Sequence, residues 1–178
     1  MRKVVAVSLL GLVLVFSRVG VLAQPPAPKP GPEIEKLKQL EGTWDTTIHS
    51  KEGESKGTAT YKMGIGGLWL RETFKADFAG KKFEGRGLMS YDSANKKYVG
   101  VWVDSMATVP MLYEGNFDKS GKIMTTTGTM PMPDGKTAKV TMTSERKDAD
   151  NMIFTMSMPG PDGKSLEAFK ITYKRKVK

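Results

Sequence analysis

Apolar and polar residues alternate with a period of two from residue 43 onward, and turn residues such as Gly66-Gly67 interrupt the alternation at short intervals. Before this region, Ile34, Leu37 and Leu40 recur at helical spacing, which predicts a short helix over residues 33–41. The alternation predicts about ten strands, at residues 43–50, 56–65, 68–78, 82–91, 97–105, 110–117, 123–130, 137–147, 152–158 and 166–175.

The predicted strands follow one another through short loops, and no intervening segment is long enough for the crossover that a parallel pair needs. We therefore predict an all-β fold, an antiparallel up-and-down meander with a short N-terminal helix. An open meander exposes two strand edges, whereas closure removes both, so a closed barrel is expected. The last strand supports closure, because Phe169, Ile171 and Tyr173 alternate with polar residues. A barrel of roughly eight strands holds one small ligand, and more strands leave more room.

Three segments are expected along the chain. Residues 1–23 have the basic start, short apolar run and small residues of a signal peptide, although Arg18 leaves open an uncleaved anchor. Residues 24–32 form a proline-rich linker, and residues 33–178 form the barrel domain. We expect export to the periplasm or medium, with no stable membrane insertion after cleavage.

The composition excludes several classes of function. The chain has no Cys, so disulfides, a lipid-anchored cysteine and cysteine catalysis are excluded. His49 is the single His and is expected on the outer face, which excludes a multi-histidine zinc site and makes a catalytic triad depend on it. The formal charge of +9 falls to +6 without Arg2, Lys3 and Arg18, and the remaining lysines are mostly scattered. No nucleic-acid module matches, and no nucleic-acid partner is expected.

Several motifs carry a resemblance to known proteins. Gly42-Thr43-Trp44, which opens the first strand after the helix, resembles the Gly-x-Trp signature of lipocalin-like barrels. With further residues, the stretch 35–176 is similar to the bacterial domain-of-unknown-function 1579 family; these are Tyr91-Asp92, Tyr98, Trp102-x-Asp104-Ser105 and Phe169-Lys170-Ile171-x-Tyr173. The resemblance implies a lipocalin-like (calycin-like) barrel of unknown activity in an exported protein. Some related barrels hold haem through a C-terminal His, which this chain lacks, so no cofactor is expected.

Glu72 stands on the apolar face of its predicted strand, next to Leu70 and Phe74. A charged acid there costs several kcal/mol unless it is paired, so Glu72 should be neutral or have a partner. Arg86 or Lys170 could supply that partner from another strand. Two interpretations follow: a polar anchor in a ligand cavity, or a structural ion pair.

The strand at 97–105 has two faces that compete for the interior. Valines occupy one face, and Tyr98, Trp102 and Asp104 occupy the other. In a filled barrel the valines point inward, whereas in a ligand-binding barrel the aromatic face lines the cavity. We favour the second arrangement, since Trp102 beside Tyr98 on the outside would form a sticky patch.

Methionine is abundant, with twelve in the chain, and Met156 and Met158 share one face of a strand. Such pairs suit a soft metal ion, but they also fill irregular apolar space, and no metal site is predicted. We predict that the lumen binds a small, largely apolar ligand. The alternatives are a filled barrel that acts as an envelope interaction domain through its basic tail, residues 174–178, and an acid–base enzyme that uses Glu72 and Asp104. An enzyme is not the expected outcome, and the predicted ligand-binding residues are Trp44, Glu72, Tyr91, Trp102, Asp104, Tyr113 and Met156.

Overall fold

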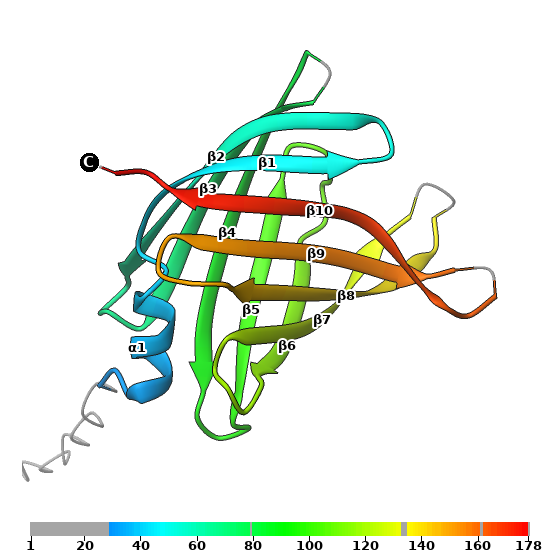
Figure 1. Cartoon of the computed structure of the whole chain (residues 1–178). Coiled ribbons are helices and arrows are strands. Elements are labelled where there is room, and N and C mark those ends of the chain that lie inside the picture. Colours follow the sequence, from blue (N-terminus) through cyan, green and yellow to red (C-terminus); the bar gives the residue numbers. More distant parts are fainter. Residues whose placement is uncertain (1–28, 79, 133–134, 161, 178) are drawn as a thin grey trace, which may run out of the picture.

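The computed structural model describes residues 29–177 apart from 79, 133–134 and 161, so the predicted signal peptide and most of the linker lie outside the described residues. Figure 1 shows a short helix at one end of a barrel of strands. The elements are α1 (Pro32–Lys38), β1 (Gly42–Ser50), β2 (Gly53–Gly64), β3 (Trp69–Phe78), β4 (Lys81–Asp92), β5 (Lys97–Asp104), β6 (Met111–Phe117), β7 (Ile123–Pro131), β8 (Thr137–Arg146), β9 (Asn151–Pro159) and β10 (Ser165–Arg175).

The sheet is a closed antiparallel barrel in which every strand pairs with its neighbours in sequence, and β1 also pairs with β10. The closing register places Trp44 opposite Arg175 and Ile48 opposite Ile171. The prediction of an up-and-down barrel is therefore confirmed. The largest shift in a strand start is in β2, which begins at Gly53 because the hairpin from Ser50 is tight.

Helix α1 begins at Pro32 and ends at Lys38, three residues before the predicted end at 41. Its apolar side, Ile34 and Leu37, is buried against the end of the barrel at which β1 begins. After Lys38 the chain forms tighter turns, because Leu40 and Glu41 donate their backbone amides to Leu37 O and Lys38 O, three residues back. The carbonyl groups beyond the helix bind other partners: Leu40 O accepts from the Trp44 indole and Gln39 O accepts from Arg175. We call this helix-covered end the closed end.

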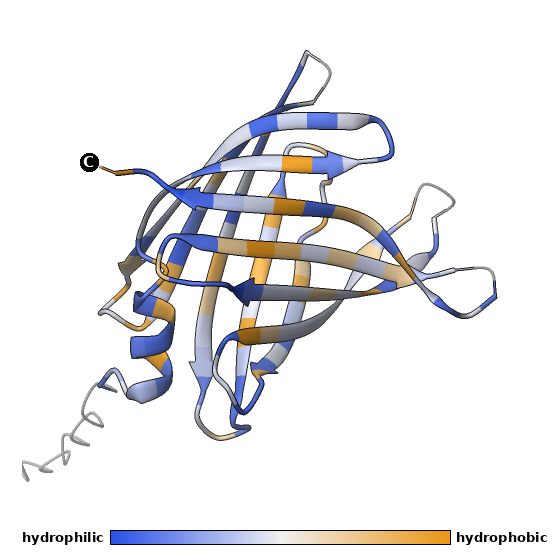
Figure 2. Cartoon of the chain, in the orientation of Figure 1, coloured by the Kyte–Doolittle hydropathy of each residue, from blue (hydrophilic) through white to orange (hydrophobic). Residues whose placement is uncertain are grey.

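Alternate residues of each strand point into the barrel, as expected for a half-buried antiparallel strand. Figure 2 shows hydrophobic and hydrophilic residues alternating along the middle of β10. Inward residues form two packed groups: one around Trp44 and Phe74 towards the closed end, and one around Val140 and Met142 on β8. Among the residues that the structure describes, no helix has the length and apolarity needed to cross a membrane.

Candidate functional site

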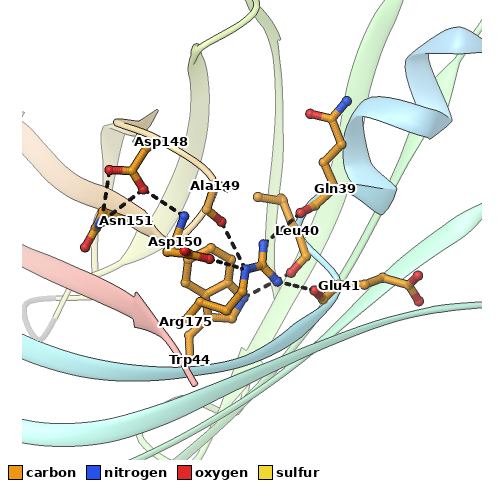
Figure 3. A network of polar contacts seen from close by, with 9 residues as sticks. All are labelled: Gln39, Leu40, Glu41, Trp44, Asp148, Ala149, Asp150, Asn151 and Arg175. Carbon is orange, nitrogen blue, oxygen red and sulfur yellow. Dashed lines mark hydrogen bonds and ion pairs between the residues drawn. The ribbon is translucent and has the colours of Figure 1, made fainter. Parts of the chain in front are cut away.

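The closed end is held by Arg175, which lies over the indole of Trp44 with its guanidinium carbon 4.1 Å from the ring centroid (Figure 3). The guanidinium also donates to three backbone carbonyl groups, those of Gln39, Glu41 and Ala149, and lies 3.4 Å from a carboxylate oxygen of Asp150. Trp44 is fully buried in this network. Trp44, one of the predicted ligand-binding residues, therefore lies in the network that holds the closed end together.

The basic tail is partly engaged in the same region. Besides the contacts of Arg175, the Lys176 ammonium lies 3.1 Å from a carboxylate oxygen of Asp45. Two charges of the basic tail, those of Arg175 and Lys176, are thus paired with acids of the barrel domain.

The aromatic face of β5 points into the lumen, as we favoured from the sequence. Tyr98 is 3% exposed, whereas Val103, on the opposite face, is 46% exposed. The register pairs Trp102 with Gly87 and Asp104 with Gly85, so both lie beside glycines on β4. A Cβ at Gly85 would stand 2.1 Å from the Trp102 ring, which shows that the indole lies flat against the wall in space that only glycine leaves.

Tyr113 is seated on the wall in the same manner. It pairs with Gly100 across β5 and β6, and a Cβ at Gly100 would stand 2.3 Å from its ring. Two large rings are therefore laid along the inner face of the barrel. Trp102 and Tyr113 therefore line the inner face of the barrel, and that they bind a ligand stays a prediction.

Glu72 also faces the lumen, but its partner differs from the prediction. The Tyr61 hydroxyl donates a 2.8 Å hydrogen bond to Glu72 Oε1 from the neighbouring strand β2. Arg86 instead pairs with Glu84 on the outer face, and Lys170 stands opposite the outward His49. Both predicted cations were wrong because strand alternation turns their side chains away from the interior.

The environment of Glu72 changes its proton affinity. Burial raises the pKa of its carboxyl to about 7, and the hydrogen bond from Tyr61 offsets part of that rise. Burial, together with the nearby carboxylate, also raises the pKa of Tyr61, Tyr113 and Tyr173 above the usual tyrosine value. These hydroxyls therefore stay protonated at neutral pH, while Glu72 is divided between its two forms.

Several inward side chains remain partly exposed, including Glu72, Trp102 and Tyr113. Their strands are paired and their side chains point inward, so they line the interior of the barrel. Glu72 is half-buried there, and its carboxyl accepts a hydrogen bond from Tyr61.

Asp104 is held by its own hairpin. One carboxylate oxygen accepts from the Trp102 indole at 2.8 Å and the other accepts from the Met106 backbone amide at 2.8 Å. Both oxygens are thus occupied in positioning the ring and the β5–β6 loop. The geometry does not present Asp104 as the free second carboxylate that an acid–base pair with Glu72 would need.

Methionines form much of the second packed group. Met156 is 8% exposed and packs with Met111 and Met142, as the space-filling interpretation expected. Met130 and Met158 lie against the same group. Within the described residues, no three His, Asp or Glu side chains gather as a metal site.

Tyr91 lies towards the closed end, with its ring 5.0 Å from that of Tyr98, and the Tyr98 hydroxyl bonds the Glu33 carbonyl of α1. It packs against the same group of buried residues as Trp44 and Tyr61. His49 faces outward as predicted, with Nδ1 3.0 Å from a Glu54 oxygen.

The sequence interpretation missed three residues of the lumen: Tyr61, Tyr173 and Thr46. Tyr61 and Tyr173 interact with each other and with Glu72. Thr46 pairs with Tyr173 across β1 and β10, and its hydroxyl is buried without a hydrogen-bond partner among the described residues. Alternation placed Tyr173 and Thr46 inward, but a position on an inward face does not reveal which polar groups meet.

Two hollows lie on the outside of the barrel. One, of about 270 Å³, is lined by residues at the ends of β1 and β10, including His49 and Phe169. The other, of about 480 Å³, lies at the closed end beside Arg146 and Arg175. Neither hollow includes Glu72, Trp102 or Tyr113 in its lining.

Comparisons with known proteins agree with this fold. Rv2717c from M. tuberculosis is 12% identical, with a TM-score of 0.63 over 84% of this chain and 100% of that chain. The S-type phycobiliprotein lyase CPES from Guillardia theta is 11% identical, with a TM-score of 0.54 over 84% of this chain and 99% of that chain. No curated protein matches the chain. Residues 29–175 match the family described as protein of unknown function (DUF1579), and the chain belongs to that family.

Proposed function

We propose that the barrel binds a small, largely apolar molecule in its lumen. The observation that carries the proposal is an acid on the inner face of the barrel. Glu72 is half-buried, its carboxyl has one hydrogen-bond partner among the described residues, Tyr61, and the rings of Trp102 and Tyr113 line the same interior. Ligand sites combine apolar walls with a few fixed polar groups, and Glu72 with Tyr61 supplies such a group here.

The methionine group gives the second support. Met111, Met142 and Met156 pack together in the lumen with aromatic neighbours. Methionine side chains are flexible and polarisable, so they adapt to apolar bodies of different shape. The lumen thus offers apolar contact in one part and hydrogen bonding in another.

Native mass spectrometry tests the proposal on protein purified from its own host. The same protein after solvent extraction is the reference, and a carried ligand appears as a mass difference between them. Equal masses, together with no binding of the neutral dye N-phenyl-1-naphthylamine to the extracted protein, overturn the proposal.

A blocking variant locates the dye. Ala138 faces inward on β8, whereas the adjacent Lys139 faces outward and is exposed. Ala138→Trp places a large ring in the lumen and should weaken dye binding about tenfold or more, a loss of about 1.4 kcal/mol. Lys139→Trp adds the same ring to the outer face and should leave dye affinity unchanged. Equal affinities in the two variants contradict a luminal site.

We also propose that the protein acts outside the cytoplasm after removal of residues 1–23, on the strength of the signal-peptide pattern alone. The mass of the protein recovered from host periplasm or medium tests this. A mature chain that starts at residue 24 supports export, and exported protein that retains Met1 contradicts cleavage.

A further inference from the structure

Glu72 lacks the positive partner that a buried carboxylate ordinarily has. Among the described residues, no ion pair joins Glu72 to a Lys or Arg, and no cation lowers the pKa of Glu72. Its stabilisation comes from the Tyr61 hydroxyl alone. A buried charge in this state is costly, and a bound cation would remove that cost.

The groups around the carboxyl suit a cation. Tyr61, Tyr113 and Tyr173 all interact with Glu72, and Trp102 reaches it across Gly87, whose added Cβ would stand 3.3 Å from atoms of both side chains. Aromatic faces attract cations, and the attraction grows when both partners are removed from bulk water.

A second polar group in the lumen is also unpaired. The Thr46 hydroxyl is buried, with the residue 3% exposed, and has no hydrogen-bond partner among the described residues. It faces inward beside Tyr173, which in turn interacts with Tyr61 and Glu72. Buried hydroxyls nearly always have a partner, so Thr46 is a second inward polar group whose hydrogen bonding the described residues leave unsatisfied.

We propose that the ligand of the lumen is an organic cation, a protonated amine attached to an apolar body, with its ammonium group against Glu72. This inference rests on the proposed function and specifies the charge of its ligand. The ammonium replaces the missing ion-pair partner and donates to the carboxylate, while the apolar body packs among the aromatic rings and Met142 and Met156.

The assignment makes binding depend on pH. The amine pairs with the ionised form of Glu72. Burial raises the pKa of that carboxyl to about 7. The titratable groups that face it are Tyr61, Tyr113 and Tyr173, which stay neutral; Asp104 is held by Trp102 and Met106. Amine affinity should therefore fall as the pH drops below 7, by up to about tenfold per pH unit.

Three probes of equal chain length and different charge test the proposal: octylamine, octanol and octanoate. Isothermal titration at pH 8 with the extracted full-length protein should give octylamine at least about tenfold tighter binding than octanol, and octanoate the weakest. Glu72→Gln keeps the side-chain shape and should abolish the preference for amine while octanol still binds. Glu84→Gln removes an acid from the outer face and should preserve the preference.

The outcomes separate this inference from the proposed function. If octanol binds and octylamine binds no tighter, or if the amine preference survives in Glu72→Gln, the cation assignment is overturned while the luminal site remains. If neither octanol nor the neutral dye binds, the luminal site fails and the cation assignment fails with it. An amine affinity that is equal at pH 5.5 and pH 8 also overturns the assignment.

Discussion

The closed end and the lumen each hold one partly buried ionisable side chain, and the two differ in how many polar partners surround it. At the closed end, Arg175 meets three carbonyl groups, the Asp150 carboxylate and the face of Trp44. In the lumen, Glu72 meets one hydroxyl. A charge with its partners in place stabilises the fold, whereas a buried charge that lacks partners destabilises it.

Removing Trp44 should have the largest effect on this comparison. Trp44→Ala deletes a fully buried ring and the surface on which Arg175 rests, so the free energy of unfolding should fall by about 3–5 kcal/mol. Urea unfolding followed by circular dichroism measures the change. Trp69→Ala, at a partly exposed tryptophan on β3, is the matched control and should cost clearly less. Equal losses would contradict the structural role of the closed end.

Replacing Glu72 should stabilise the protein, and only at high pH. Its pKa is raised to about 7, so between about pH 4.5 and 7 the native state keeps a proton that the unfolded chain has lost. The free energy of unfolding therefore falls as the pH rises through this range. Glu72→Gln removes the effect and should stabilise the empty protein by about 1–3 kcal/mol at pH 8, with little change at pH 4.5.

Urea unfolding at the two pH values checks this prediction. Glu84→Gln is the control, because Glu84 is half-exposed and paired with Arg86 outside the barrel. It should show no stabilisation at pH 8. A loss of stability in Glu72→Gln at pH 8 would show that the carboxylate is already satisfied, and the contrast with Arg175 would disappear.

Two glycines of β4 test how the lumen wall seats Trp102. A Cβ at Gly85 would stand 2.1 Å from the indole, whereas a Cβ at Gly87 would stand 3.3 Å from its nearest neighbours. Gly85→Ala should displace the ring and cost about 2 kcal/mol, and Gly87→Ala should cost less than about 1 kcal/mol. Urea unfolding gives both values, and a shift of the tryptophan emission should appear in Gly85→Ala. Indistinguishable variants would show that the ring is not fixed to the wall.

The smallest effect is expected at Thr46. Thr46→Val removes a buried hydroxyl that has no partner and keeps the side-chain shape, so stability should rise by about 1 kcal/mol or less. Thr60→Val is the control, because the Thr60 hydroxyl lies 3.3 Å from that of Thr43, and it should not stabilise. Thermal unfolding compares the two variants. A destabilised Thr46→Val would mean that the hydroxyl has a partner after all.

Most of the fold could be predicted from local pattern. The alternation of Phe169, Ile171 and Tyr173 predicted the last strand correctly. The alternation in β5 predicted that the Trp102 side chain points into the barrel. The helix end was placed three residues too late because Leu40 and Glu41 still bond backward along the chain, to Leu37 and Lys38, at a spacing of three residues. The apolar spacing that predicted the helix does not distinguish this tighter turn from an α-helical one.

The site was only partly predictable. Glu72 stood out because an acid interrupts an apolar face, but its partner was sought among the cations. Tyr61 was missed because a tyrosine on an inward face is typical of an ordinary core. Its role depends on the hydrogen bond from its hydroxyl to Glu72, which lies on another strand. That Trp44 and Tyr91 bind a ligand stays a prediction, and their place along the barrel axis follows from register, which a single strand does not reveal.

The sequence by itself determined the number of strands, their inward faces, the closure of the barrel and the presence of one acid among apolar residues, because period-two alternation and turn residues act locally. Only the tertiary structure decided that Arg175 is fully partnered while Glu72 is not. That difference depends on which side chains of distant strands meet inside the barrel, and strand register across the whole closed sheet sets those meetings.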